Sequence, residues 1–425
     1  MGADGTGYLT CRQVRCYRAH DARALRQARI RARTKEDRGL SPAIGFQDAT
    51  AIAGIAQTAF SKHLEPTEAE LACTVIVEAC ADAGIDPSEV DALCSYTMEA
   101  TEEVDIVRNI GSGEITFFSQ VGYGGGAGCG VVGHAAMAVA TGQAEVAVAW
   151  RARKRGSGPR PWTSTSVQLR VPGAWTRPFG MLRPVDEIAM LTRRYMYEYG
   201  ATRDHLANVA MAVRKHANMN PAAIMHDKPM SREDYMSSRW VSEPLCLFDN
   251  CLETDGALAC VVVSAERARD LRHPPVYVHA FAQGLPPEHQ TMVNFFNDDP
   301  LTGPAWACAR RLWANAAFGP EDVNVAQIYD AFSPLILLSL EGYGFCKRGE
   351  AGPMTENGNL EWGTGSLPVN TSGGGLSEAY VHGFNLINEG VRQMRGTSTA
   401  QVEGAETCLV TSGEGVPTSA LLLRR

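Results

Sequence analysis

The stretch Gly84–Tyr96, GIDPSEVDALCSY, decides the fold class because it ends an apolar helix pattern and starts a strand pattern. Its glycine and proline break the predicted helix Ala69–Ala83, and Val90–Tyr96 follows as a predicted strand. A second copy of this arrangement lies later in the chain, where Phe318–Tyr329, FGPEDVNVAQIY, follows the predicted helix Trp306–Ala317. Such alternation of helices and strands predicts an α/β architecture.

A second internal similarity involves two runs of three glycines. Gly124–Gly126 follows the predicted strand Ile115–Val121, and Gly373–Gly375 occupies the matching place later in the chain. Each run precedes a helix-like segment and then a β-rich segment, Ala144–Trp150 in one case and Thr407–Thr411 in the other. Two similarities in the same order indicate an internal duplication.

The duplication divides the chain into parts. Residues 1–45 are rich in arginine with little apolar periodicity, and we expect a disordered leader without a catalytic role. Residues 46–268 form the predicted first half and residues 269–425 the second. Residues 151–247, rich in Arg, Met, Pro and His, are predicted to form a cap inserted in the first half.

Composition excludes several classes of protein. The 425 residues carry a net charge of −8, so no overall basic field favours nucleic acid or anionic lipid. The 12 cysteines form no CxxC pair or zinc-like cluster, which favours a reducing compartment and predicts no metal. No apolar run approaches the roughly 20 residues of a membrane span, and we expect a cytoplasmic protein.

Gly128–Gly133 matches the dinucleotide fingerprint GxGxxG. In a nucleotide-binding fold this motif lies in the first strand–helix turn, and an acidic residue ends the next strand. Here the next predicted strand ends at Arg151, so we interpret the glycines as a packing feature. The chain also lacks the phosphate-loop, HExxH and GxSxG motifs.

Two tyrosines stand at informative places. Tyr329 ends a predicted strand and precedes Asp330–Ser333, whereas Tyr380 follows the second glycine run. A tyrosine at the end of a strand is ordinarily a packing residue. The segments around these two tyrosines indicate a role other than packing.

Five segments together resemble the thiolase superfamily, nearest its sterol-carrier-protein-x branch and the bacterial lipid-transfer-protein-like aldolases of steroid side-chain degradation. They are Ile85–Pro87, Thr254–Ala257, Asp330–Ser333, Asn370–Gly375 and Ser412–Gly415. The resemblance covers nearly all of the chain after the leader. It implies two duplicated βαβαβαββ halves, stacked in five layers (αβαβα), with no intrinsic cofactor.

The resemblance also shows which catalytic groups have changed. A thiolase has a nucleophilic cysteine at the start of a buried helix, and counting along the chain places that position at Gly126. Cys129 lies nearly a full turn further on, and alternation points Cys408 away from the site of the second cysteine. Tyr329 and Tyr380 stand where the family has histidines, so we expect proton transfer without an acyl-enzyme.

This chemistry suits a retro-aldol cleavage, in which a base takes the β-hydroxyl proton and a donor stabilises and protonates the enolate. We assign Tyr329 as base and Tyr380 as acid or enolate stabiliser, with the reverse assignment left open. Because a free tyrosine has a pKa near 10, we expect one of the two to have a lowered pKa.

Four further residues are expected near the pair. His382 and Asp330 are candidates for supporting contacts behind the tyrosines. The backbone N–H groups around Gly126 and Gly374 are candidates for an oxyanion hole in the acyl-CoA pocket. We expect no metal among the site residues.

The resemblance implies the substrate and partners as well. The substrate would be a 17-hydroxy steroid side-chain CoA thioester, with coenzyme A as part of it, giving a 17-ketosteroid and propionyl-CoA. The chain would form a homodimer that binds a smaller OB-fold, zinc-ribbon protein as a heterotetramer. Two alternatives remain: a non-catalytic acyl-CoA or lipid-binding thiolase relative, and an acetyl-CoA acyltransferase that uses Cys129 or Cys408.

Overall fold

The structure is a computed structural model that describes residues 45–158, 176–287, 289, 292 and 297–425. Contacts divide the chain into Met1–Pro42 and Ala43–Arg425, and the second unit contains all of the described residues. Nearly all of the predicted leader and residues 159–175 of the predicted cap lie outside the described part. The domain limits stay a prediction.

The first half of the sheet contains five strands in the order β3-β2-β4-β7-β1. Strand β2 pairs in parallel with β3 and β4, and β7 pairs antiparallel with β4 and β1. Nine of the ten residues of β7, DGALACVVVS, are buried, as expected for a strand covered on both faces. The strands are β1 (Thr50–Gln57), β2 (Ala92–Tyr96), β3 (Phe117–Val121), β4 (Val146–Lys154) and β7 (Asp255–Ser264).

The second half repeats this topology. Its strands follow the order β8-β11-β10-β9, and Val369 bridges in parallel to Ala326 of β9 at the outer edge. Pairing of Ala51 with Tyr277 and of Ile52 with Val276 joins the halves into one nine-stranded sheet. The strands are β8 (Val276–Gly284), β9 (Val325–Gln327), β10 (Thr407–Thr411) and β11 (Thr418–Arg424).

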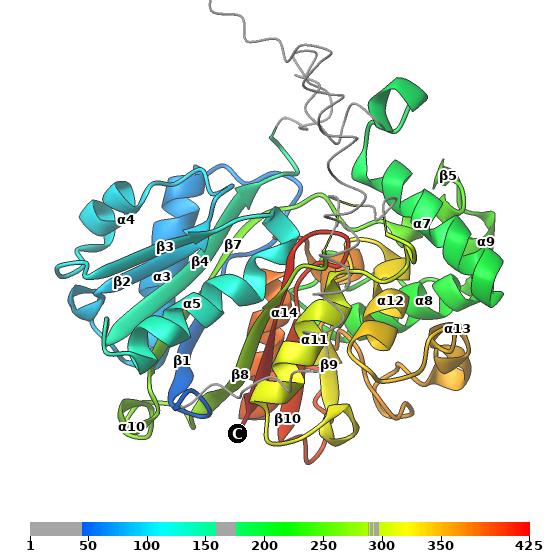
Figure 1. Cartoon of the computed structure of the whole chain (residues 1–425). Coiled ribbons are helices and arrows are strands. Elements are labelled where there is room, and N and C mark those ends of the chain that lie inside the picture. The colour runs from blue at the N-terminus through cyan, green and yellow to red at the C-terminus, as the bar shows by residue number, and fades with distance from the viewer. Residues whose placement is uncertain (1–44, 159–175, 288, 290–291, 293–296) are drawn as a thin grey trace, which may run out of the picture. The chain divides into compact units, whose positions relative to one another are not determined.

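Helices cover both faces of each half and place α5 and α14 in the centre (Figure 1). Helix α3 contacts β1, β4 and β7, helix α11 contacts β8 and β11, and α5 and α14 each contact strands of both halves. These contacts confirm the predicted thiolase-like α/β fold. The helices are α3 (Glu68–Ala83), α4 (Glu103–Ile110), α5 (Gly128–Ala140), α10 (Ala265–Ala268), α11 (Pro304–Asn315), α12 (Ser333–Gly342), α13 (Ala351–Met354) and α14 (Phe384–Arg395).

The two predicted helix–strand breaks each form one 3₁₀ turn, Pro87–Glu89 and Pro320–Asp322. In each turn the acidic last residue accepts the backbone N–H of the residue just before the turn, at 3.1 Å and 3.0 Å. Proline at the first position starts each turn, and the carboxylate of its last residue caps it after the preceding helix has ended. The same local sequence therefore directs the chain into a strand twice.

A further group of elements lies together on one side in Figure 1. It comprises α7 (Pro184–Tyr199), α8 (Arg203–Met219), α9 (Arg232–Ser237), β5 (Trp240–Ser242) and β6 (Leu245–Cys246). Helix α8 contacts α12 and the turn Gly374–Glu378 that precedes Tyr380. Strand β4 continues past Trp150 to Lys154 and pairs with β7 throughout.

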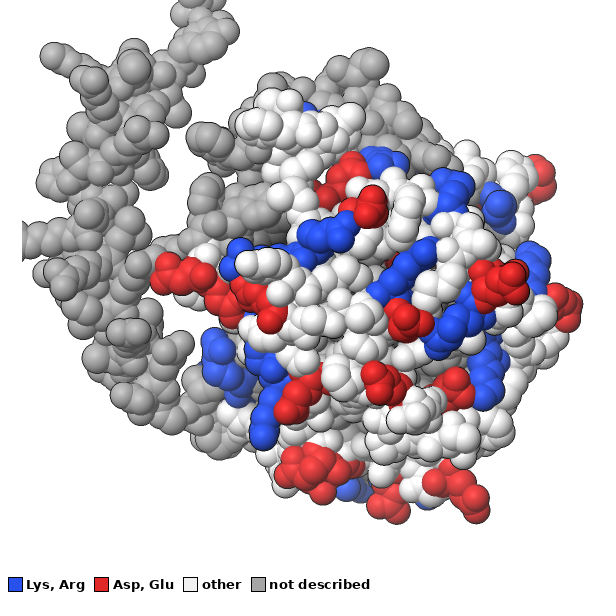
Figure 2. Space-filling view, turned by 90° about the vertical axis from the view of Figure 1, so that its right-hand side faces the viewer, with Lys and Arg blue, Asp and Glu red and all other residues white. Residues whose placement is uncertain are grey.

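The surface agrees with the low net charge. On the face that Figure 2 shows, the described basic and acidic side chains lie interspersed, without a large patch of one sign. Among the described residues, no helix has both the length and the apolar character needed to cross a membrane.

Candidate active site

Tyr329 follows β9 and precedes the loop that enters α12. Its backbone N–H donates to Thr411 Oγ1 of the neighbouring strand β10 at 3.0 Å. The ring is buried, with 5% of its surface exposed. The hydrogen bond to β10 therefore fixes the backbone of Tyr329 and hence the starting point of its side chain.

Tyr380 is carried by the second glycine turn, and Asp330 holds that turn in shape. The Asp330 carboxylate accepts the N–H groups of Gly375 at 2.7 Å and Leu376 at 3.2 Å. A side chain at Gly374 would come within 2.2 Å of Asp330 Oδ2, and Gly374 has φ +58°, so glycine is required there. Burial raises the pKa of Asp330 to about 6. Asp330 supports the loop through backbone contacts, and these do not involve the tyrosine hydroxyls.

Thr254 anchors Tyr380 itself. The Tyr380 N–H donates to Thr254 Oγ1 at 2.7 Å, and that hydroxyl donates to the Tyr380 carbonyl at 3.1 Å. Thr254 is fully buried and directly precedes β7. The Thr254 hydroxyl thus both accepts a hydrogen bond from the Tyr380 backbone and donates one to it.

These supports bring the two phenols into direct contact. The Oη atoms of Tyr329 and Tyr380 lie 2.5 Å apart, and the ring planes meet at 62°. This separation lies within the range of an O–H···O hydrogen bond. The two predicted catalytic tyrosines therefore form one hydrogen-bonded unit.

The expectation that one tyrosine has a lowered pKa is wrong for the chain by itself. Burial raises the pKa of Tyr329 well above 10, and the contact with Tyr380 raises it further. Burial also raises the pKa of Tyr380, to about 12. The Arg155 guanidinium, 5.3 Å from the Tyr380 ring centroid, and the hydrogen bond with Tyr329 both oppose this rise in pKa.

The first glycine turn lies against the tyrosine pair. A Cβ atom on Gly125 would lie 1.9 Å from Tyr329 Oη, whereas one on Gly126 would lie 1.9 Å from the carbonyl oxygen of Pro417. A side chain facing the tyrosines would therefore come from residue 125, which corrects the count from Gly126 by one residue. The Gly126 N–H donates to the Tyr123 carbonyl at 3.0 Å, so this amide is already used within the turn.

His382 lies beside Tyr380, as expected. The two rings meet edge to face, with centroids 5.6 Å apart. Arg151 donates from Nη2 to His382 Nδ1 at 3.0 Å and from Nη1 to Glu99 Oε2 at 3.0 Å. Burial, together with the charges of Arg151, Arg155 and Arg153, lowers the pKa of His382 well below 6.5.

The two candidate thiols are unsuited to nucleophilic attack. Burial raises the pKa of Cys129 to about 12 and that of Cys408 well above its usual value. Cys129 Sγ lies 3.4 Å from the Val410 carbonyl oxygen, and Cys408 packs beside Gly390 of α14. A neutral, buried thiol is a weak nucleophile, so the geometry gives no support to an acyl-enzyme at either residue.

Sequence reasoning gave no site role to several residues: Glu99, Gly125, Arg151, Arg155 and Thr254. The run RARKR at residues 151–155 carried a usable signal, because alternate arginines on a strand share one face. The role of Glu99 and the direction of Gly125 have no such signal. Among the residues that the structure describes, no group of three His, Cys, Asp or Glu side chains is placed to hold a metal.

The comparisons with known proteins agree with the fold. The family model described as "Thiolase C-terminal domain-like" matches residues 288–423. A monomeric SCP2-thiolase like protein from Mycobacterium smegmatis superposes with a TM-score of 0.66 at 18% identity, over 89% of this chain and 78% of that chain. Fold and site thus define a thiolase-fold protein with a tyrosine pair in place of an accessible thiolate.

Relatives of higher identity narrow the assignment. The chain is 47% identical to a steroid side-chain-cleaving aldolase of Thermomonospora curvata, over 88% of this chain and 97% of that one. It is also 47% identical to a 17-hydroxy-3-oxo-4-pregnene-20-carboxyl-CoA lyase of Mycobacterium tuberculosis, over 88% and 98% of the two chains. A solved "Ltp2-ChsH2(DUF35) aldolase" superposes with a TM-score of 0.86, at 47% identity over 89% of this chain and 98% of that chain. The chain belongs to the family of steroid side-chain-cleaving aldolases.

Proposed function

We propose that this chain is a carbon–carbon lyase that cleaves a steroid acyl-CoA by a retro-aldol reaction. The observation that carries the proposal is the 2.5 Å contact between Tyr329 and Tyr380 in a member of the aldolase family. The substrate is a β-hydroxyacyl-CoA with the hydroxyl on C17 of the steroid. Its products are a 17-ketosteroid and propionyl-CoA, and coenzyme A enters only as part of the substrate.

The high pKa of both phenols favours a concerted proton relay. One tyrosine accepts the substrate hydroxyl proton as it passes its own proton to the other, which protonates the α-carbon of the enolate. The C17–C20 electron pair becomes the enolate, and the C17 oxygen becomes the ketone. One proton leaves the substrate hydroxyl and one reaches the α-carbon, so both tyrosines end protonated and no free phenolate has to form at neutral pH.

The surroundings of the two phenols favour one direction for this relay. Arg155 lies over the Tyr380 ring, and its charge supports negative charge on that oxygen. Burial and the contact with Tyr380 raise the pKa of Tyr329, so Tyr329 keeps its proton until negative charge develops on the enolate. We therefore assign Tyr380 to the substrate hydroxyl and Tyr329 to the enolate, which reverses the assignment made from the sequence.

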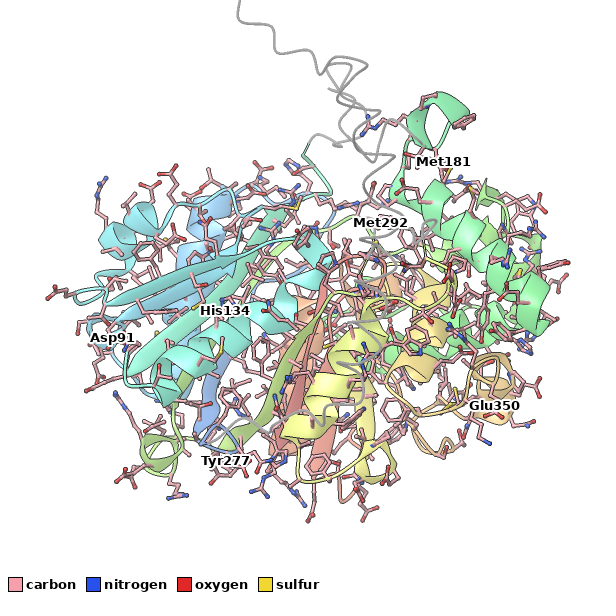
Figure 3. All side chains as sticks on the ribbon, in the orientation of Figure 1. Asp91, His134, Met181, Tyr277, Met292 and Glu350 are labelled. Atoms are coloured by element: carbon pink, nitrogen blue, oxygen red, sulfur yellow. The ribbon has the colours of Figure 1, made fainter. Side chains whose placement is uncertain are left out.

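The exposed edge of the sheet supports a homodimer. Strand β3 is the outermost described strand of its half, and Phe118 on it is 70% exposed. Next to it lies a hollow of about 470 Å³, lined by Tyr123, His134 and Gln283 among others; His134 is labelled on α5 in Figure 3. An exposed apolar edge strand is ordinarily covered, and a second copy pairing along β3 covers this one. Phe118→Glu should then shift the mass measured by light scattering toward the monomer.

A partner protein and the cellular location complete the proposal. The solved aldolase of 47% identity carries ChsH2(DUF35) in its description, and we assign this chain a similar smaller partner with an OB fold and a zinc ribbon. The ten described cysteines are free thiols. Free thiols are typical of a reducing compartment, which supports a cytoplasmic location.

One experiment separates the candidate functions. The complex of this chain with its partner is incubated with 17-hydroxy-3-oxo-4-pregnene-20-carboxyl-CoA, and products are followed by mass spectrometry. Release of a 17-ketosteroid with equimolar propionyl-CoA is the expected result. Tight binding without turnover would instead support a non-catalytic acyl-CoA-binding protein, and acyl transfer to free coenzyme A would support a thiolase. Full activity of the chain without partner would contradict the partner proposal.

A further inference from the structure

A buried network of charged residues ends at the candidate site. The side chains of Glu99 and Arg151 are both 0% exposed and form an ion pair with a 3.0 Å N···O distance. Glu99 Oε2 also accepts the backbone N–H of Ala152 at 3.0 Å. The other arm of the Arg151 guanidinium donates to His382 Nδ1 at 3.0 Å. Removing a buried ion pair from water is costly, so this network calls for an explanation beyond stability.

The network determines which nitrogen of His382 carries the proton. A guanidinium has only donors, so Nδ1 must accept the hydrogen bond from Arg151. The ring proton of a neutral imidazole then resides on Nε2. Burial and the nearby charges of Arg151, Arg155 and Arg153 hold the pKa of His382 well below 6.5. The other groups around it, Tyr96, Tyr380 and the paired Glu99, leave the ring neutral.

The Nε2 atom lies at the glycine turn next to the tyrosine pair. A Cβ atom on Gly124 would be 3.8 Å from His382 Nε2, and one on the next residue, Gly125, would be 1.9 Å from Tyr329 Oη. In the part of the chain that the structure describes, Nε2 has no hydrogen-bond partner. The turn thus has a free N–H donor on one side and the phenol pair on the other.

We propose that His382 donates its Nε2–H to the thioester carbonyl oxygen of the substrate, and that Glu99 and Arg151 are positioning residues that keep the donor in this tautomer. The inference rests on the proposed retro-aldol function. Negative charge develops on that oxygen when the C–C bond breaks, and a preorganised donor stabilises it. His382 keeps its proton throughout, so the relay through the tyrosines stays balanced. The donor replaces the Gly126 N–H, which the turn already uses.

The tautomer can be tested without any turnover. In ¹⁵N-histidine-labelled complex, the His382 signals, assigned by their loss in His382→Gln, should show a neutral ring protonated on Nε2 from pH 8 to pH 5. In Arg151→Met the ring should titrate closer to the usual histidine pKa of about 6.5. Because Arg151→Met leaves Glu99 unpaired, Glu99→Gln is the second variant. A proton on Nδ1, or a charged ring at pH 7, in the wild type would overturn the inference.

Kinetics test the donor role. His382→Phe should lower kcat by about a hundredfold to a thousandfold with little change in thioester binding. His382→Gln, whose amide can both accept from Arg151 and donate to substrate, should recover part of that loss. Glu99→Gln should lower kcat by about 10- to 100-fold, the range for residues that orient a catalytic group. His273→Gln is the matched control. The Nε2 atom of this histidine pairs with Asp82 Oδ1 at 3.0 Å, and the pair does not contact the tyrosines.

Failure of this inference and failure of the proposed function are distinguishable. A wild-type complex that binds the thioester without cleaving it would overturn the proposed function, whatever the state of His382. Cleavage by His382→Phe at the wild-type rate would overturn the inference alone. Loss of activity in His382→Phe and His382→Gln to the same extent, with both proteins folded, would also contradict the donor role, because glutamine supplies a donor and phenylalanine does not.

Discussion

The hydroxyl of Tyr329 occupies the space that a side chain on Gly125 would need. A Cβ atom there would lie 1.9 Å from Tyr329 Oη and 2.3 Å from its Cζ. The position of the tyrosine ring therefore depends on the glycine, although the two residues come from different halves of the chain. A chain with this tyrosine cannot also carry a nucleophile at residue 125 without moving the ring.

Substitution at this glycine should disturb the tyrosine pair. Gly125→Ala should displace the Tyr329 ring, destabilise the protein by about 1–3 kcal/mol through overpacking, and sharply reduce cleavage. Gly122→Ala is the control, because its Cβ would meet nothing closer than Thr97 Oγ1 at 3.9 Å. Urea unfolding and initial rates would measure both effects. Equal behaviour of the two variants would contradict the coupling.

The tyrosines should act as a unit in catalysis. Tyr329→Phe and Tyr380→Phe should each lower kcat by about 10²–10⁴-fold, the usual contribution of a proton-transferring group. The double variant should lose little more than either single one, because removing either hydroxyl breaks the relay. Tyr277→Phe, on β8 and labelled in Figure 3, is the control. Additive losses in single-turnover experiments would point to two independent roles.

Tyr380 should make stability depend on pH in the alkaline range. Its folded pKa of about 12 exceeds the ordinary value of 10, so the unfolded chain releases this proton first. The contribution of Tyr380 to stability is therefore fully present below pH 10 and is lost as the pH rises toward 12. The unfolding free energy should fall more steeply over this range in the wild type than in Tyr380→Phe. Parallel curves for the two proteins would contradict a raised pKa.

The cysteines should be dispensable for turnover. Cys129→Ala and Cys408→Ala each remove a buried thiol whose pKa is raised, and we expect kcat to remain within about threefold of the wild type because the relay uses no sulfur. Some loss of thermal stability is expected from the lost packing. Loss of cleavage in a variant that stays folded would revive the acyl-enzyme alternative.

Asp330 should affect the reaction only through the loop that it holds. Asp330→Asn keeps one acceptor oxygen for the N–H groups of Gly375 and Leu376 and should cost about 1–3 kcal/mol in stability, as for a buried donor left without its partner. The rate of cleavage should fall as the Tyr380 loop becomes less ordered. Hydrogen exchange of the backbone amides of this loop measures that loss of order. An unchanged exchange rate with lost activity would assign Asp330 a direct role.

Much of the fold was readable from local patterns. The predicted helix Ala69–Ala83 and strand Thr407–Thr411 match α3 and β10 within one residue. The break at Pro87–Glu89 and its counterpart at Pro320–Asp322 formed as predicted because caps and prolines act over a few residues. The site was only partly readable. Tyr329 and Tyr380 were found, but the direction of their pKa shifts was not, since burial is a property of the packed molecule.

The sequence by itself indicated the thiolase-like α/β fold, the two tyrosines and the lack of a cysteine at the position of the thiolase nucleophile, because repeats, turn residues and residue identity are local properties of the chain. Only the tertiary structure decided that Gly125 faces Tyr329, that Arg155 lies over Tyr380, and that Glu99 and Arg151 set the tautomer of His382. These relationships join residues from different strands and loops. Distances and burial between such segments arise only when the sheet and its central helices pack together.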